Sequence, residues 1–266
     1  MRLMHHNGLK ALQFPALSAL PGFFHGIFLR DAADGKGGGM PFDLGMGDVT
    51  PQALVRSNRR RMVALFGAGL RSVYGRQVHG REVGVLKKDG HRPEQNADGQ
   101  WQLDGDALVT DIKGAALVIL VADCQPVLMV DPVKGVVANV HSGWRGSVQN
   151  IIAQTVGRMA ADFHSRAQDL VCGIGPSLGP CCAEFIHYKD ELPEPFWKYR
   201  HSAFHFDFWQ ASRDQLTGAG VRNDNIHLSG LCTRCNPHLF FSYRGERHTG
   251  RFAAVVGLEP GKGSMG

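Results

Sequence analysis

Apolar residues gather in short, continuous runs through the middle of the chain instead of alternating with polar ones. Runs rich in valine, isoleucine and leucine stand at residues 107–110, 116–122, 126–130 and 136–140. Short runs of this kind are typical of strands that are covered on both faces. Further strands are expected elsewhere in the chain, at 23–30, 72–78, 82–86, 170–174, 226–229 and 252–258. The pattern therefore predicts a protein built around buried sheet.

Three stretches show the spacing of amphipathic helices. In the first, Thr50 gives an N-cap signal and Pro51 a first-turn signal, and apolar residues then follow at helical spacing as far as Gly67. The second helix is expected over 146–163 and the third over 207–219. Three helices between so many strands indicate mixed layers of α and β structure.

The chain shows no linker, repeat or break in composition between these elements. We therefore predict one catalytic domain over 23–260, preceded by an irregular lead-in at 1–22 and followed by a flexible tail at 261–266. The glycine-rich stretch 31–40 is expected to be a loop, and the polar stretch 87–105 a second one.

Length and composition narrow the cellular setting. The 266 residues can bury a sizeable core without disulfides, and the longest apolar run, 115–122, is far shorter than the roughly 20 residues that cross a bilayer. No secretory signal is evident either, so we expect no membrane association and a cytoplasmic protein. In that reducing compartment the 6 cysteines would be thiols or metal ligands.

The charge pattern favours a small anionic substrate over nucleic acid. The net charge is +5, but the basic residues are dispersed, and the tight run at 59–61 falls on a predicted helix where a solvated face is the simplest interpretation. A nucleic-acid surface would need a basic stripe with interleaved aromatic residues. A mildly basic surface instead suits a substrate such as phosphate.

Three of the predicted strands carry a metal-ligand residue type at a point where the backbone turns. These residues are His79, Cys124 and His141, at spacings of 45 and 17 residues. Two imidazoles and one thiolate are a donor set of catalytic zinc, and wide spacing suits a site assembled from different strands rather than a zinc finger. The alternative is that each is an ordinary residue at a strand end.

The other cysteines point less clearly to a site. Cys232 and Cys235 form a lone Cys-x-x-Cys, while Cys181, Cys182 and Cys172 lie some 50 residues earlier. A structural zinc site would need a second well-spaced pair. We predict buried thiols, with a redox role for Cys232 and Cys235 as the alternative.

Cationic residues suggest where an anion would bind. Arg145 precedes a predicted helix start, a combination that suits a phosphate or carboxylate. Arg244, Arg247 and Arg251 fall in one later segment and either close over the same cleft or are solvated. Among the remaining histidines, which we expect at the surface or in packing positions, His25 on the first strand is a weaker candidate for the pocket.

The sequence resembles the YfiH family, also called the laccase-domain or multicopper polyphenol oxidoreductase family, whose members are known as purine nucleoside phosphorylases or peptidoglycan editing factors. The resemblance covers roughly residues 16–258. It rests on seven short pieces in one order, at 76–80, 106–110, 122–128, 141–146, 173–176, 241–244 and 249–251.

The resemblance implies an α+β fold, a single-domain α-β-β-α layered sandwich. It implies a metal bound by His79, Cys124 and His141, Zn²⁺ in the first place with Cu²⁺ as the alternative. The implied activity is phosphorolysis of adenosine, inosine, guanosine and S-methyl-5′-thioadenosine, with adenosine deamination, so that purine nucleosides and phosphate are the expected partners. Amide hydrolysis on a peptidoglycan precursor and copper-dependent polyphenol oxidation are the alternatives.

A four-copper laccase mechanism can be tested on the sequence itself. Such oxidases need about ten histidines arranged in His-x-His pairs, and this chain of 13 histidines contains no His-x-His. A multicopper mechanism is therefore not expected, although one copper ion could occupy a mixed nitrogen and sulfur site.

Four further residues are predicted to serve catalysis. Asp43 stands where the family commonly has asparagine, which replaces an amide donor with a carboxylate. Arg59 lies in a segment that matches the family and is expected to point into the site. Asp123, next to Cys124, is the candidate proton shuttle or supporting group, and Arg145 the candidate phosphate ligand. Protein partners, oligomeric state and the preferred nucleoside do not follow from the sequence.

Overall fold

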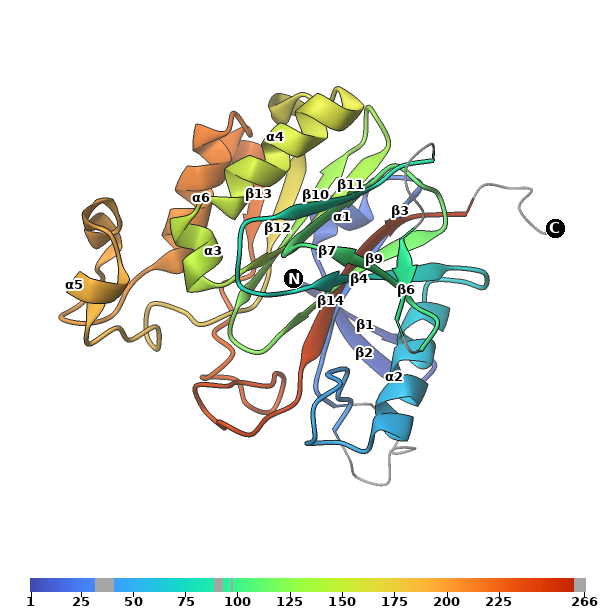
Figure 1. Cartoon of the computed structure of the whole chain (residues 1–266), viewed down its shortest axis with the longest axis horizontal. Coiled ribbons are helices and arrows are strands. Elements are labelled where there is room, and N and C mark those ends of the chain that lie inside the picture. The colour runs from blue at the N-terminus through green and yellow to red at the C-terminus, as the bar shows by residue number, and fades with distance from the viewer. Residues whose placement is uncertain (32–40, 89–92, 97, 261–266) are drawn as a thin grey trace.

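The computed structural model describes residues 1–31, 41–88, 93–96 and 98–260, in which two sheets pack face to face between layers of helices (Figure 1). The larger sheet has the strand order β1 (Arg2–His6), β2 (Leu9–Gln13), β3 (Phe23–Phe28), β14 (Phe252–Leu258), β9 (Ala115–Val121), β4 (Arg71–Arg76), β7 (Trp101–Asp104) and β6 (Glu94–Gln95). The smaller sheet has the order β13 (Ile226–Leu228), β12 (Val171–Ile174), β10 (Gln125–Asp131), β11 (Val136–Ser142), β8 (Ala107–Thr110) and β5 (Val83–Leu86).

Helices cover the outer face of each sheet (Figure 1). On the larger sheet, Met62 of α2 (Gln52–Ala64) packs in one cluster with Val118 and Val255. On the smaller sheet lie α4 (Ile151–Phe163) and α6 (Phe208–Gly218). This arrangement confirms the predicted α+β class and the α-β-β-α layering.

The core between the sheets explains why the apolar runs are continuous. In β14, Phe252, Ala254 and Val256 face the smaller sheet, while Ala253 and Val255 face the helix layer. Each sheet thus buries both of its faces, and side chains on both sides of a strand must be apolar.

The predicted irregular lead-in at 1–22 is wrong. β1 and β2 form an antiparallel hairpin that extends the larger sheet, and α1 (Pro15–Ser18) follows it. The turn between the strands is Asn7-Gly8, in which both residues have positive φ, 48° and 74°. Asn-Gly is a strong hairpin signal because both residue types tolerate this backbone.

Other elements differ from the prediction in detail. The predicted helix at 146–163 is two helices, α3 (Trp144–Val148) and α4, because Asn150 adopts a left-handed φ of 56° and caps α4 through the Ala153 amide. Pro51 rather than Thr50 is the N-cap of α2. The expected polar loop at 87–105 contains β6 and β7.

Short helical segments were not predicted. They are α5 (Tyr188–Glu191) and the 3₁₀ turns η1 (Ala167–Asp169), η2 (Glu194–Tyr199) and η3 (Asn223–Asn225). Most of the predicted loop at 31–40, and the tail at 261–266, lie outside the described residues. No described helix has the length and hydropathy of a membrane span.

Candidate metal centre

The pairing of β10 with β11 brings Cys124 and His141 together. Pro126 lies opposite His141 in this antiparallel pair, and Cys124 comes directly before β10. β8 pairs with the other side of β11, with Ala107 opposite Val140, so Asp106 lies next to His141. Three strands of the smaller sheet therefore converge on one point.

Asp106 fixes the third donor, His79, which follows β4 of the other sheet. The amides of Val78, His79 and Gly80 donate to its carboxylate at 3.1, 2.9 and 2.8 Å. His79 has a left-handed φ of 62°, a conformation that costs about 1 kcal/mol or more outside glycine. These three hydrogen bonds offset that cost and hold the imidazole at the junction of the two sheets.

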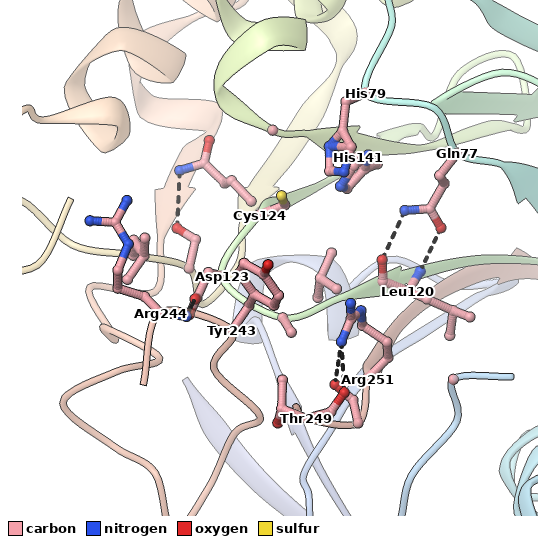
Figure 2. Close-up of a pocket in the computed structure, with 18 of the residues that line it drawn as sticks. Gln77, His79, Leu120, Asp123, Cys124, His141, Tyr243, Arg244, Thr249 and Arg251 are labelled. Atoms are coloured by element: carbon pink, nitrogen blue, oxygen red, sulfur yellow. Dashed lines mark hydrogen bonds between the residues drawn. The ribbon is translucent and has the colours of Figure 1, made fainter. Parts of the chain in front are cut away.

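The donor atoms of His79, Cys124 and His141 lie within 4.8 Å of one another, and Figure 2 shows the three side chains pointing toward the same space. A tetrahedral ion bound at about 2.0 to 2.3 Å separates its ligands by roughly 3.3 to 3.8 Å, so small side-chain rotations suffice. Gly143 borders the cluster, and a Cβ at this position would lie 2.9 Å from His79 Nδ1. The residues fit a zinc ion, and three protein donors are the number found in catalytic sites.

The charges in the cluster depend on Asp106 as well. Burial alone would lower the pKa of His141, but the Cys124 sulfur and the Asp106 carboxylate raise it to about 9. Burial would raise the pKa of Asp106, yet hydrogen bonds from His141 and the neighbouring amides bring it below its usual value. Burial and the nearby His141 lower the pKa of His79. The carboxylate thus stays charged and holds the Nδ1 of His141 at 2.7 Å.

Asp106 was not predicted as a site residue. It is fully buried. In the sequence it is a carboxylate directly before an apolar strand and the first residue of the 106–110 piece of the resemblance, and neither signal assigned it a role. The predicted supporting group, Asp123, contacts neither histidine. Its carboxylate instead accepts hydrogen bonds from Thr233 Oγ1 and from the Arg244 amide, both at 2.6 Å. Asp123 thus connects the segments that contain Thr233 and Arg244 to the turn that contains Cys124.

A cavity of about 820 Å³ opens beside the three donors. Arg244, Arg247, His248 and Arg251 are among the residues that line it, so the predicted cations border the cleft, while Arg244 and Arg247 also reach solvent. Figure 2 shows Arg244, Tyr243 and Arg251 across the cavity from the histidines. The remaining walls are largely apolar and include Met46, Leu120, Val121, Trp144, Phe185 and Phe208.

Asp43 lines this cavity, as expected of a site residue. Its Oδ1 accepts from the amides of Gly45 and Arg251 at 2.9 and 2.8 Å. An asparagine oxygen could accept both bonds, so the carboxylate adds mainly its negative charge to the wall.

Arg59 does not point into the cavity, which corrects the prediction. It is 4% exposed, its Nε donates to the Leu44 carbonyl at 2.9 Å, and its guanidinium lies over the Tyr74 ring at 4.6 Å. Arg59 therefore supports the backbone beside Asp43. Arg145 is exposed and lies over Trp144 at 4.4 Å, outside the cavity lining.

The predicted pocket candidate His25 is a packing residue. It is 2% exposed and its Nε2 accepts from the Phe14 amide at 2.9 Å. Burial lowers its pKa to about 4, so the ring is neutral and serves as a hydrogen-bond acceptor in the core.

The prediction of buried thiols is wrong for Cys181 and Cys235, which are exposed. The sulfurs of Cys181, Cys182, Cys232 and Cys235 all lie within 4.8 Å of one another, so the fold supplies the second pair that the sequence spacing did not suggest. All six cysteines are free thiols. Cys172 lies apart in β12, and burial raises the pKa of its thiol.

Comparison with known proteins finds relatives that match most of the chain. Residues 25–259 match a family described as multi-copper polyphenol oxidoreductase laccase. The chain is 33% identical over 245 residues to purine nucleoside phosphorylase YlmD of Geobacillus stearothermophilus, covering 87% of this chain and 89% of the relative. It is also 33% identical over 272 residues to a purine nucleoside phosphorylase of Deinococcus radiodurans, with 97% of each chain covered.

Solved structures show the same architecture. The crystal structure of YlmD from Geobacillus stearothermophilus superposes with a TM-score of 0.80 at 30% identity, over 96% of this chain and 98% of that one. The structure of YfiH from Bacillus licheniformis superposes with a TM-score of 0.81 at 25% identity, over 96% and 97%.

Proposed function

The chain belongs to the multi-copper polyphenol oxidoreductase laccase family, and from this premise we propose that it is a zinc-dependent purine nucleoside phosphorylase that also deaminates adenosine. The observation that carries the proposal is the cluster of His79, Cys124 and His141 on the wall of a cavity of about 820 Å³ that Arg244, Arg247 and Arg251 also line. Relatives at 33% identity bear the name purine nucleoside phosphorylase.

The arginines that line the cavity suit the phosphate that phosphorolysis consumes. Arg251 is held in place by its Nη1, which donates to the carbonyls of Thr249 and Gly250 at 2.9 Å. Arg247 also lines the cavity, and its side chain makes no hydrogen bond to the described residues. We assign phosphate binding to Arg247 and Arg251 rather than to Arg145, since charge-assisted bonds from guanidinium groups match phosphate oxygens.

The apolar side suits a purine ring. Tyr243 presents a ring that is 55% exposed and lines the cavity, and Leu120 and Phe185 belong to its walls. A flat aromatic base packs well against such surfaces, and the exclusion of water strengthens the attraction between phosphate and the arginines.

His79, Cys124 and His141 would hold the metal. A Zn²⁺ ion bound there supplies Lewis acidity to the reacting substrate. Asp106 keeps the Nδ1 proton of His141 in a hydrogen bond of 2.7 Å, which leaves Nε2 as the donor toward the ion. Asp123, with both oxygens engaged, acts by positioning the cavity wall.

Multicopper chemistry has no support in the described part of the chain. The described residues form two groups of potential metal ligands: one contains two histidines and one cysteine, and the other contains four cysteines. A laccase needs several histidine-rich copper sites. Copper could replace zinc at the mixed cluster of nitrogen and sulfur donors.

The experiment compares inosine and adenosine with and without phosphate, using chromatography of the products. We expect ribose 1-phosphate and free base only when phosphate is present, and inosine from adenosine in its absence. The Cys124→Ala variant should lose both activities and Cys172→Ala should keep them. Absence of ribose 1-phosphate, or release of an amino acid from a muramoyl precursor instead, would contradict the proposal.

A further inference from the structure

We propose that Cys181, Cys182, Cys232 and Cys235 form a second metal site, separate from the cavity, that binds one structural Zn²⁺ ion through four thiolates. Cys181 and Cys182 follow β12, and Cys232 and Cys235 follow β13, its parallel neighbour in the smaller sheet. None of the four lines the cavity.

The distances between the sulfurs suit this ion. Cys235 Sγ lies 3.6 Å from Cys181 Sγ and 3.5 Å from Cys182 Sγ, and all four sulfurs lie within 4.8 Å of one another. Four sulfurs at about 2.3 Å from a tetrahedral zinc ion stand roughly 3.8 Å apart. Four thiolates are also the donor number of closed, structural zinc sites.

The arrangement favours a shared ion over disulfides. Disulfides join sulfurs in pairs, but Cys235 is almost equally far from Cys181 and Cys182, so neither of these two is its preferred partner. An ion treats the four sulfurs alike. Cys182 and Cys232 are 8% and 5% exposed while Cys181 and Cys235 reach solvent, so that the ion would close a cluster that is open on one side.

The backbone holds the two cysteine pairs together before any ion binds. Ser177 accepts from the Thr233 amide at 3.0 Å, and its own amide donates to the Leu231 carbonyl at 3.3 Å. Within the two segments, the Cys182 amide donates to the Gly179 carbonyl at 2.9 Å and the Asn236 amide donates to the Cys232 carbonyl at 3.1 Å.

This site would brace the cavity. Thr233, inside the Cys-x-x-Cys, donates to Asp123 at 2.6 Å, and Asp123 in turn accepts from the Arg244 amide at 2.6 Å. An ion that fixes Cys232 and Cys235 therefore fixes the contacts that hold Arg244 at the cavity wall. The inference rests on the cysteines alone and stands whether or not the cavity performs phosphorolysis.

The test measures zinc in protein purified with a reductant and without chelator. The Cys232→Ser/Cys235→Ser variant should contain one zinc ion per chain fewer than the wild type, while Cys172→Ala should match the wild type. In the Cys124→Ala/His141→Ala variant, which removes the other cluster, X-ray absorption should show zinc with four sulfurs at about 2.3 Å.

Three results would overturn the inference: unchanged zinc in the double serine variant, a zinc shell with fewer than four sulfurs, or a non-reduced mass lower by four hydrogens, which means two disulfides. Should the double variant fail to fold, Co²⁺ loaded into the Cys124→Ala/His141→Ala protein decides the question. The proposal expects the absorption of a tetrahedral cobalt thiolate there, and its absence contradicts it.

Discussion

At the scale of single residues, Asp106 joins two of the three candidate metal donors. Residue type and position at strand ends made His79, Cys124 and His141 candidates, and the resemblance to a family selected them as the metal donors. The role of Asp106 could not be predicted, because it depends on the register of β8 against β11 and on a turn that the sequence leaves open. The cluster of four cysteines could not be predicted for the same reason, because the parallel pairing of β12 with β13 brings them together.

Asp106→Asn should weaken zinc binding at the His79 cluster by about 10- to 100-fold. The variant loses one acceptor oxygen, so it cannot hold both the 78–80 turn and His141. Competition with a chromophoric chelator measures the affinity. Asp104→Asn, at a position whose side chain is 79% exposed, is the matched control, and equal affinity in the two variants would show that Asp106 does not support the ligands.

His25 makes stability depend on acid pH. Burial lowers its pKa from 6.5 to about 4, so between these values the unfolded chain binds the proton that the folded chain excludes. This contribution, up to about 3 kcal/mol, is fully present above pH 6.5 and is lost as the pH falls toward 4. Urea unfolding at pH 7 and 4.5 should show a smaller loss in His25→Gln than in wild type, and equal losses would be inconsistent with the buried neutral ring.

Asp43→Asn should lower the KM for phosphate about 3- to 10-fold, because it removes a negative charge from the cavity wall while its oxygen still accepts from the Gly45 and Arg251 amides. The KM for inosine serves as the internal control and should change little. Steady-state kinetics at varied phosphate measures both values. A higher KM for phosphate would mean that the carboxylate assists binding.

At the scale of elements, most strands and the three long helices followed from apolar pattern alone, since a strand buried on both faces or an amphipathic helix is a local property. The pairing of the strands within the two sheets could not be predicted from this pattern. β4 and β5 are near neighbours in sequence yet belong to different sheets, because the turn at 78–80 is tied to Asp106. The hairpin of β1 and β2 was overlooked although Asn7-Gly8 carries its turn signal.

α2 and the segment beside Asp43 illustrate how one element positions another. Asn58 and Arg59 donate from the helix to the carbonyls of Asp43 and Leu44 at 3.0 and 2.9 Å. The sequence predicted the helix, but it could not show that Arg59 turns toward Leu44 rather than toward the cavity. The segment and the helix therefore form one unit.

Arg59→Met should lower the free energy of unfolding by about 2 to 3 kcal/mol, because it leaves a buried carbonyl without a donor and removes the contact with the Tyr74 ring. Arg60→Ala, at an exposed position of the same helix, should change it by less than about 0.5 kcal/mol. Urea denaturation followed by circular dichroism compares the two. Similar stabilities would assign Arg59 no structural role.

At the scale of the whole molecule, each of the two sheets positions some of the residues of the site. The smaller sheet positions Cys124, His141 and Asp106, while His79 and Arg251 adjoin strands of the larger one. The layered fold was predictable through the resemblance to a family. The cavity between the donors and the arginines was not, since its shape depends on loops that meet only after the sheets have packed.

The rate at which ribose 1-phosphate forms from inosine and phosphate tests the central claim most directly, because inosine has no amine to lose and only phosphorolysis can yield this product. Wild-type protein saturated with zinc should form it, and Cys124→Ala treated in the same way should be slower by about 10³-fold, equivalent to some 4 kcal/mol of lost transition-state stabilisation. Equal rates in the two proteins, or no ribose 1-phosphate from either, would contradict a phosphorylase site at His79, Cys124 and His141.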